Sequence, residues 1–456
     1  MAAKFRTRFF VLLVLIGLLA GCHAGKGRGA GASAQKITIL FTNDLGGHIN
    51  TDRNGKGGLA RIAALVKEIK AENPNTILVD AGDAAVGTAF TTETRGEAIF
   101  RVMNAVGYDA SIFGNHEFDL GETQARRYQD VARFPLLACN LQDREGKPFS
   151  PEFAIFQLGD LRLAVIGVAN PGTTNLVDKT KIAGLKFLAP ESEIRRMQNQ
   201  LAGQAEVVIL LSHQGIRGDI SLAYHTSGIP LIIGGHSEVK INGLRFENGV
   251  AIAQAGDNGW YLGKVDFSWD PALKKASGFS GKLIAIDAGI PEDPAVRKVI
   301  DEEAKSLPPG LEKEIGQTWF TINRIFLGFW LAELLKQEGN ADFGVMNTGG
   351  VRSEIYRGKI TVADIYQVMP FNDKLAVFEM DGSELMRVKS LRYFYFSRGP
   401  RITAGKTYRV TSLDYLVRIN DFPGASSIQF RNDLLRDKML ERIEKDHGFR
   451  RFWSKR

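Results

Sequence analysis

Five short apolar segments of the chain lead directly into polar residues of the kinds that bind metals. The segments are 36–41, 75–79, 106–113, 207–211 and 229–233, and the polar residues that follow them are Asn43-Asp44, Asp80 with Asp83, Asn115-His116, Ser212-His213 and His236. Continuous apolar runs of this length predict buried strands. Because ligands of α/β sheets collect at the carboxyl ends of the strands, we expect these residues to converge on one site.

Helical segments alternate with the predicted strands. Residues 59–71 and 190–201 are two such segments, and this βα alternation predicts a layered α/β domain over 36–285. A charged helical segment over 295–306 lies between two Pro-rich stretches and marks a boundary. We therefore predict a linker helix within 286–314 and a smaller second domain over 315–446.

The amino terminus predicts export. Three basic residues within 1–8 precede an apolar run of about a dozen residues, which is too short to span a bilayer and is typical of a signal peptide. Leu19-Ala20-Gly21-Cys22 closes the run like a lipoprotein signal, so residues 1–21 would be removed, Cys22 lipidated, and residues 22–35 left as a flexible tether. The alternative is an ordinary signal peptide with an incidental Cys. The residues after Cys22 favour the outer membrane of a diderm bacterium, with the protein on the periplasmic side.

Composition and charge add further expectations. With 456 residues and 44% hydrophobic content, the chain can bury a core in each of two domains. Only two cysteines are present, so Cys139, inside an apolar run, is expected to be a buried free thiol. The net charge of +7 is spread along the chain and does not suggest nucleic-acid binding. The basic tail 447–456 is either simply solvated or in contact with anionic lipid.

The segment 113–119 carries the most specific chemistry. Asn115, His116 and Asp119 follow a predicted strand within five positions, which core packing does not explain. Alone, the motif could be an Asn capping a helix and a His on a loop. With four other strand ends also delivering Asp, Asn or His, a centre of two metal ions explains the set better, because it needs carboxylate, imidazole and amide ligands from several segments.

These motifs resemble the calcineurin-like metallophosphoesterases and, among them, the two-domain bacterial 5'-nucleotidase and UDP-sugar hydrolase family, over about residues 36–430. The resemblance implies a four-layer metallophosphoesterase sandwich followed by a smaller α/β substrate-binding domain. It also implies two divalent metal ions, which could be manganese, magnesium, zinc, cobalt or calcium. The ligands implied for the second metal are Asp83, which bridges both ions, Asn115, His213 and His236.

The resemblance assigns Asp44 to the first metal and makes His116 with Asp119 a catalytic pair that stabilises charge on the phosphoryl group or the leaving oxygen. Two positions depart from the family at the first metal. Gly46 stands where the family has a His ligand, and Glu238 stands where a His or Gln is more usual. We expect Glu238 to rebuild the site with Asp44 and Asp83, while His48 either binds the metal or lies behind it or beside the phosphate.

The second domain resembles the part of the family that selects the substrate. Segment 346–352 matches a Gly-rich loop in which Asn347, Gly350 and Arg352 would contact the ligand, Arg352 through its forked guanidinium. Phe371 and Tyr415 match two rings that sandwich a nucleobase, although they could also be ordinary core aromatics.

Asp421 matches a carboxylate that binds ribose hydroxyls, but the family's Gly-Gly before it is Ile419-Asn420 here. Asp373 replaces an Asn that often contacts the base, and Phe329-Trp330 replaces the Asn-Leu of the family's segment after the linker.

The sequence as a whole predicts an exported, lipid-anchored, dimetal-dependent hydrolase of nucleotides or related phosphate esters. Two alternatives remain open at this stage. One is a related hydrolase with a non-nucleotide substrate such as a sulfur ester, and the other is a catalytically weak nucleotide-binding lipoprotein. The oligomeric state, the metal and the base are not assigned by the sequence.

Overall fold

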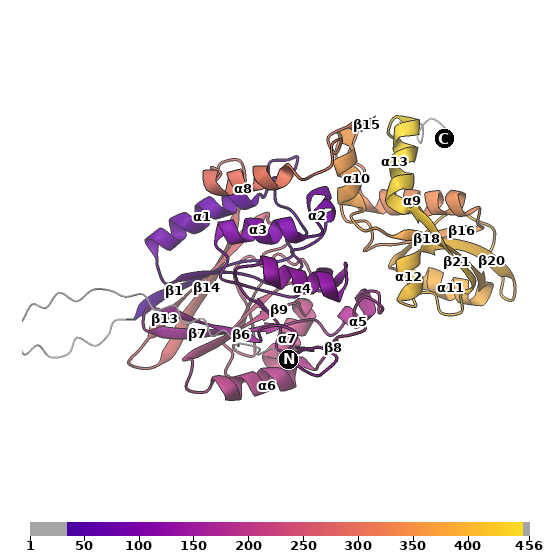
Figure 1. Ribbon diagram of the computed structural model, residues 1–456. Helices are drawn as coiled ribbons and strands as arrows, with labels where there is room; N and C mark the ends of the chain where they lie inside the picture. Colours follow the sequence, from indigo (N-terminus) through magenta and orange to yellow (C-terminus); the bar gives the residue numbers. More distant parts are fainter. Residues whose placement is uncertain (1–33, 450–456) are drawn as a thin grey trace, which may run out of the picture.

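The computed structural model describes residues 34–449, which form a larger and a smaller α/β domain (Figure 1). The larger domain contains two six-stranded sheets. Their strand orders are β14-β13-β1-β2-β3-β4 and β11-β12-β10-β9-β7-β6. The predicted signal peptide, Cys22 and most of the predicted tether and basic tail lie outside the described residues.

The strand positions agree with the apolar segments of the sequence. The first sheet consists of β1 (Gln35–Thr42), β2 (Thr76–Asp80), β3 (Ala110–Ile112), β4 (Leu136–Leu137), β13 (Tyr261–Asp270) and β14 (Lys275–Ala285). The second consists of β6 (Phe153–Leu158), β7 (Leu161–Val168), β9 (Val207–Ser212), β10 (Leu231–Gly234), β11 (Arg245–Glu247) and β12 (Val250–Ala253). A short pair, β5 (Leu141–Gln142) and β8 (Lys186–Phe187), stands apart from both.

Side chains from the facing surfaces of the two sheets form one core, and helices cover the outer surfaces. Ile39 of β1 belongs to the core between the sheets, whereas its neighbour Leu40 belongs to the core under the helices. This alternation is why the strands read as continuous apolar runs. The helices over the first sheet are α1 (Leu59–Glu72), α3 (Glu97–Val106), α4 (Glu122–Val131) and α8 (Pro294–Ala304), and those over the second are α6 (Pro190–Leu201) and α7 (Gly215–His225). The four-layer prediction is confirmed.

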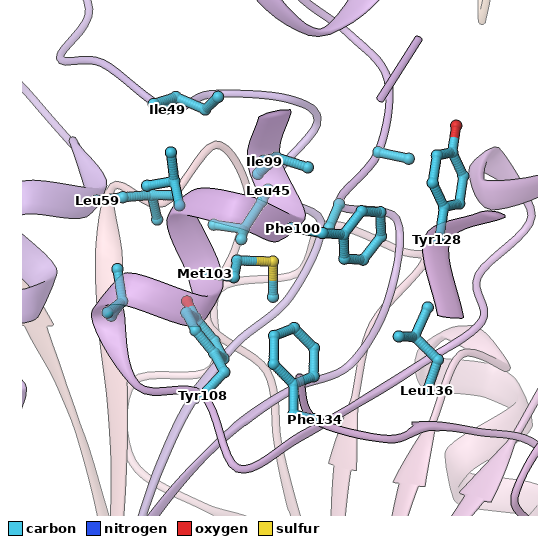
Figure 2. Packing of buried hydrophobic residues seen from close by; sticks show 14 of the residues in the cluster. Leu45, Ile49, Leu59, Ile99, Phe100, Met103, Tyr108, Tyr128, Phe134 and Leu136 are labelled. Atoms are coloured by element: carbon cyan, nitrogen blue, oxygen red, sulfur yellow. The ribbon is translucent and has the colours of Figure 1, made fainter. Parts of the chain in front are cut away.

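The helical core over the first sheet is built largely from aromatic and branched side chains (Figure 2). Phe100 of α3 stacks on Tyr128 of α4 with ring centroids 4.8 Å apart. Leu45 of the Asp44 loop is fully buried in the same cluster. The loops that carry the polar residues are therefore packed against the core at their bases.

Parallel pairing brings the carboxyl ends of the central strands level with one another. Thr42 of β1 pairs with Asp80 of β2, and Asp80 pairs in turn with Ser111 of β3. In the second sheet Ser212 of β9 lies opposite Gly234 of β10. The polar residues after these strands are thus delivered to one edge of the two-sheet stack.

The predicted linker contains a helix, but that helix is packed on the first domain. Val296 and Ile300 of α8 are buried in the core over the first sheet, and Arg101 of α3 binds Glu303 at 2.7 Å. Because α8 is fixed to the first domain, the connection between the domains is the segment 305–313 that follows it.

The smaller domain has a five-stranded sheet in the order β19-β16-β20-β18-β21 and a separate two-stranded sheet. Its elements are β15 (Glu314–Thr318), α9 (Arg324–Gly339), β16 (Phe343–Asn347), β17 (Gly358–Thr361), α10 (Val362–Val368), β18 (Lys374–Asp381), α11 (Gly382–Ser390), β19 (Phe394–Phe396), β20 (Thr407–Leu413), α12 (Asp414–Arg418), β21 (Ser426–Leu434) and α13 (Leu435–Asp446). α9 and α13 pack on this sheet around their own hydrophobic core. Each domain therefore has a core of its own.

Cys139 is 2% exposed and forms no disulfide, as the sequence predicted. Burial raises the pKa of its thiol well above the usual range, so it is expected to be unreactive in the folded protein. Within 34–449, no helix combines the length and apolarity that a membrane span requires.

Truncation of a side chain between the two sheets should destabilise the first domain. Leu163 of β7 is fully buried there, so Leu163→Ala leaves a cavity and should cost about 2–5 kcal/mol, or about 5–15 °C in the Tm of this domain. Leu273→Ala is the control, because Leu273 is 72% exposed and should leave Tm unchanged. Thermal denaturation followed by circular dichroism measures both; equal Tm values for the two variants would contradict the two-sheet core.

Candidate active site

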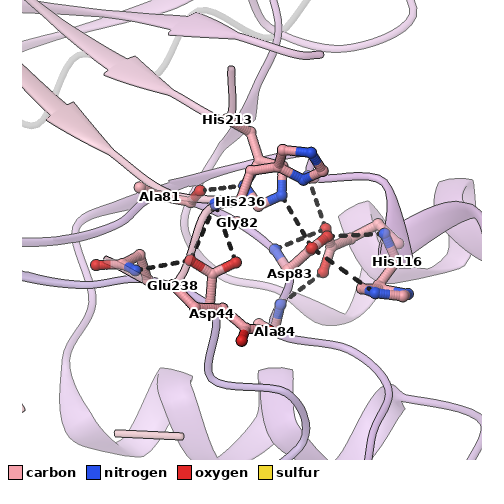
Figure 3. Close-up of polar contacts among 12 residues, drawn as sticks. Asp44, Ala81, Gly82, Asp83, Ala84, His116, His213, His236 and Glu238 are labelled. Carbon is pink, nitrogen blue, oxygen red and sulfur yellow. Dashed lines mark hydrogen bonds and ion pairs between the residues drawn. The ribbon is translucent and has the colours of Figure 1, made fainter. Parts of the chain in front are cut away.

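Asp83 is the centre of the polar cluster at the edge of the two sheets (Figure 3). One of its carboxylate oxygens accepts a hydrogen bond from the backbone N–H of His116 at 2.7 Å, and the other lies 2.9 Å from Nε2 of His213. The backbone of Asp83 is left-handed, with φ of 57°. Such a conformation costs of order 1–3 kcal/mol in a residue other than Gly and collects at functional sites.

The strained backbone extends to other residues of the cluster. Asp44, His236 and Glu238 also have positive φ, between 51° and 73°. The turn after β2 and the Asp44 loop are tied together, since Asp44 N–H donates to the carbonyl of Gly82 at 2.9 Å. Four residues that the sequence predicted as metal ligands are therefore held in costly conformations by surrounding hydrogen bonds.

The buried side chain of Glu117 fixes the position of Asp83 through hydrogen bonds to the backbone. Its carboxylate is 1% exposed and accepts hydrogen bonds from the backbone N–H groups of Asp83, Ala84, Ala85 and Gly114, at 2.7–3.0 Å. Burial raises the pKa of Glu117 to about 7, and the neighbouring Asp83 carboxylate acts in the same direction. Glu117 lies inside the 113–119 motif, but no role was predicted for it from the sequence.

Among the described residues, Oδ1 of Asn115 is buried and has no hydrogen-bond partner. Nε2 of His213 is also buried, and among these residues its only partner is the carboxylate of Asp83 at 2.9 Å. His213 is oriented by its other ring nitrogen, since Nδ1 lies 2.7 Å from the carbonyl of Ala81. Unpaired buried polar atoms are rare in proteins. Because the unpaired oxygen of Asn115 lies beside two other predicted ligands of the second metal, the residues present fit that metal.

His213, His236 and Asp83 also meet the distance requirement for a shared ion. One potential ligand atom from each lies within 4.8 Å of the others. The centroids of the two imidazole rings are 5.2 Å apart, with an angle of 62° between the ring planes. With Asn115 at the same place, this set offers two imidazoles, one carboxylate and one amide, which suits a transition metal or zinc.

Burial shifts the pKa values of two predicted ligands in this cluster, Asp44 and His236. Burial raises the pKa of Asp44 to about 8, and the nearby Asp83 carboxylate adds to this, although His213 opposes it. Burial also lowers the pKa of His236 to about 4, and repulsion by His213 adds to that shift. A bound divalent cation would favour an ionised Asp44 and a neutral His236, which are the states that ligate metals.

His116 and Asp119 form the predicted pair. Nδ1 of His116 lies 2.7 Å from Oδ2 of Asp119, while Nε2 points towards Asp83 at 4.0 Å. Burial alone would lower the pKa of His116, but the carboxylates of Asp119 and Asp83 outweigh it and raise the pKa to about 9. The imidazole is therefore cationic at neutral pH and can stabilise negative charge beside the metal ligands.

The first metal site is less complete than the second. Both oxygens of Asp44 accept the backbone N–H of His236, and one also accepts Nδ2 of Asn43 at 2.7 Å. Gly46 offers no side chain, and a Cβ added there would lie 3.4 Å from Oδ1 of Asn258 and 3.5 Å from Nδ1 of His48. Asn258 and His48 therefore border the place of the missing imidazole.

The remaining residues of the first site are engaged elsewhere. Nδ1 of His48 lies 3.1 Å from the carbonyl of Leu45, which leaves only Nε2 for any ligand. Glu238, predicted to rebuild the site, instead forms an ion pair with Arg352 of the second domain at 3.2 Å. The asymmetry that the sequence predicted is thus present in the geometry.

A cavity of about 290 Å³ lies between the domains and joins the metal cluster to the predicted substrate residues. From the first domain it is lined by Asp83, Asn115, His116, Asp119, His236 and Glu238. From the second it is lined by Asn347, Gly350, Arg352, Phe371, Asp373 and Tyr415. Asp421, which follows α12 (Asp414–Arg418), is not among the lining residues that the structure describes, and its ribose contact remains a prediction.

Contacts between the domains close the sides of this cavity. Phe371 stacks on His116 with ring centroids 5.6 Å apart and an angle of 19° between the planes. The hydroxyl of Tyr415 donates to the carbonyl of Leu176 at 2.5 Å. Phe371 and Tyr415 thus lie at the domain interface, only partly buried, which argues against a role as ordinary core aromatics.

The loop after β7 also reaches the cavity, although no motif in the sequence predicts this. Leu176, Asp178 and Lys181 line the cavity, and Nζ of Lys181 donates to the carbonyl of Asp119 at 2.6 Å. The segment contains α5 (Thr173–Leu176) and follows no recognised motif. The second domain packs over this loop through the contact of Tyr415 with Leu176, and such a contact between domains has no local sequence pattern.

Comparisons with known proteins agree with this geometry. Residues 37–239 match the family of calcineurin-like phosphoesterases, and residues 321–391 match the 5'-nucleotidase C-terminal domain. A 5'-nucleotidase of Vibrio vulnificus is 28% identical to the chain over 433 residues, which are 82% of this chain and 78% of that protein. The trifunctional nucleotide phosphoesterase YfkN of Bacillus subtilis is 25% identical over 441 residues, which are 85% of this chain but only 29% of that much longer protein.

Solved structures share the whole two-domain fold. The 5'-nucleotidase precursor of Thermus thermophilus has a TM-score of 0.82 at 22% identity, with 91% of this chain and 97% of that chain covered. The sulfate thiohydrolase SoxB of Thermus thermophilus has a TM-score of 0.79 at 17% identity, with 90% and 94% covered. Because these identities are low, the likeness establishes the fold and does not choose between the two activities.

The two family matches occur in the same order as the two domains of the fold. The first match contains the predicted metal ligands, and the second contains the predicted Gly-rich loop and Phe371. The chain is therefore a 5'-nucleotidase-like metallophosphoesterase, in which a domain that matches the calcineurin-like phosphoesterases is followed by one that matches the 5'-nucleotidase C-terminal domain.

Proposed function

We propose that this protein hydrolyses nucleotides at a centre of two divalent metal ions, on the periplasmic side of a membrane to which lipidated Cys22 anchors it. One observation carries the catalytic part of the proposal. A single cavity is lined both by predicted metal ligands of the first domain and by the aromatic rings and guanidinium of the second. A molecule with a phosphate at one end and a flat base at the other would fill it.

The chain supplies ligands for two metal sites, and the second site is expected to bind its metal more strongly than the first. The second site would use Asp83, Asn115, His213 and His236, and the first would use Asp44, Asp83 and Glu238. When bound, two such ions supply a water of lowered pKa and neutralise phosphoryl charge. The carboxylate-rich first site favours manganese, magnesium or calcium over zinc. The ion pair with Arg352 occupies only Oε1 of Glu238, which leaves Oε2 as the oxygen that could bind the metal.

The protein's own groups would orient the ester and stabilise the charge that develops. Cationic His116, held by Asp119, lies at the cavity wall beside Asp83, where it can stabilise the phosphoryl oxygens or the leaving oxygen. Arg352 lines the same cavity and can bind a phosphate with both ends of its guanidinium. Phe371 and Tyr415 offer flat surfaces to a base.

Loss of either His116 or Asp83 should abolish phosphate release. We expect His116→Ala to lower kcat about 10²–10⁴-fold, since it removes a positioned charge, and Asp83→Ala to lower both activity and metal content. The assay is phosphate release from AMP, other nucleoside monophosphates and UDP-glucose, with manganese, magnesium, cobalt, calcium or zinc. His225→Ala is the matched control, because His225 is exposed on α7 and outside the cavity.

The same assay separates the alternatives. Nucleotide-dependent thermal stabilisation without turnover under any metal would support a binding lipoprotein instead. Hydrolysis of a sulfur ester with no release from nucleotides, given verified metal loading, would indicate the related hydrolase. Either outcome would reject the nucleotidase proposal.

Restoring the missing imidazole should strengthen the first metal site. In Gly46→His the added Cβ meets no atom closer than 3.4 Å, and His tolerates the left-handed backbone better than most residues. We expect the weaker of two metal-binding events in calorimetry to tighten about tenfold or more. Gly46→Ala is the control, because it has the same backbone strain, of about 1–2 kcal/mol, without a ligand. Identical metal titrations of the two variants would contradict a weak first site.

Membrane attachment should depend on the thiol sulfur of Cys22. Cys22→Ser removes the thiol to which a lipid would be joined, so the variant should move from the membrane fraction to the soluble periplasmic fraction of a diderm host. Cys139→Ser, which changes the buried thiol, should leave the distribution unchanged. Fractionation followed by immunoblotting measures this. Soluble wild-type protein would contradict the anchor.

A further inference from the structure

The carboxylate of Asp373 lies in the cavity without a partner. Asp373 lines the same cavity as Phe371 and Tyr415. Among the described residues, no hydrogen bond or ion pair ends on its carboxylate, although its backbone carbonyl accepts the N–H of Leu435 at 3.1 Å. A half-buried carboxylate with both oxygens free is available to a ligand.

The loop that carries Asp373 is held on both sides. At its end, Oδ1 of Asp414 accepts the backbone N–H of Lys374 at 2.8 Å, which fixes the start of α12, and with it Tyr415, against this loop. From the other side the guanidinium of Arg436 donates to the carbonyl of Pro370 at 3.2 Å and to Oδ1 of Asn372 at 2.6 Å. The carboxylate and the two rings are therefore preorganised relative to one another.

The charged groups around Asp373 do not neutralise it. Asp414 and Asp119 face it as like charges, and Lys181 and Arg436 as opposite charges. Nζ of Lys181 is bound to the carbonyl of Asp119, and the guanidinium of Arg436 is bound to carbonyl and amide oxygens of the Phe371 loop. The Asp373 carboxylate is consequently the acceptor at this end of the cavity that no described group engages.

We propose that Asp373 makes the cavity selective for guanine, because its two carboxylate oxygens accept hydrogen bonds from the ring N1–H and the exocyclic amino group. This inference rests on the proposed nucleotide substrate. Among the common bases only guanine has two adjacent N–H donors on one edge. Adenine and cytosine place a ring-nitrogen lone pair beside their amino group, which a carboxylate repels. Hypoxanthine and uracil have a single N–H next to carbonyl oxygens.

The electrostatics set a pH range for this selection. Burial raises the pKa of Asp373 to about 7, and the Asp414 carboxylate adds to the shift, whereas Lys181 opposes it. Since a raised pKa leaves the acid neutral below that value, the double acceptor is fully present only above about pH 7. At pH 6 the neutral acid offers one donor and one acceptor, which suits adenine.

The test compares GMP with IMP, which differ only in the exocyclic amino group. For the wild-type protein at pH 8 we expect kcat/KM for GMP to exceed that for IMP by roughly ten- to a hundredfold, because IMP leaves one carboxylate oxygen unpaired. Asp373→Asn should bring the ratio close to one, since an amide has only one acceptor. Asp437→Asn is the control, as Asp437 is exposed on α13 and loses the same charge. The wild-type ratio should also fall between pH 8 and pH 6.

Calorimetry with guanosine and inosine on the metal-loaded wild-type protein repeats the comparison without turnover. Tighter binding of guanosine by a similar factor would support the inference. Equal turnover and equal binding of the two members of each pair would overturn it while leaving the nucleotidase proposal intact. Failure to hydrolyse any nucleotide would reject the nucleotidase proposal, and the calorimetric comparison would still decide the role of Asp373.

Discussion

The buried carboxylate of Glu117 holds together the two loops on which the rest of the site depends. It accepts four backbone N–H groups from Gly114 and from residues 83–85, and so joins the turn after β2 to the motif after β3. Asp83 can keep a left-handed backbone because this contact fixes the turn. A neutral or shorter side chain at Glu117 could not satisfy four buried donors at once.

The proposed metal ligands lie on two sides of this turn, and the two sets are not equally complete. Towards the second sheet, Asn115 has an unpaired buried oxygen, and His213, His236 and Asp83 bring potential ligand atoms within 4.8 Å of one another. Towards the Asp44 loop, Gly46 leaves a place that Asn258 and His48 border without filling. The described residues therefore offer one set of atoms that meets the distance requirement for a shared ion, while the proposed first site lacks an imidazole at Gly46.

The second domain supplies the residues of the cavity that could select a substrate. It brings rings and charges to a cavity whose far wall is the His116 pair, and Arg352 reaches across to Glu238 of the first domain. Because this contact joins a phosphate-binding candidate to a metal-binding candidate, closing of the domains and loading of the first site are expected to influence one another. Because α8 is packed on the first domain, the residues after it form the connection between the domains.

The sequence by itself determined five strands of the first domain, β1, β2, β3, β9 and β10, and the polar residues that follow them. Continuous apolar runs and residue types at strand ends are local properties of the chain, so Asp83, His213 and His236 could be named before the fold was known. Only the tertiary structure decided what each group contacts. The nest around Glu117, the ion pair of Glu238 with Arg352, and the approach of Lys181 and Asp373 to one cavity join residues that are distant in sequence or lie on different domains. Such contacts depend on how layers and domains pack, and no local pattern encodes that packing.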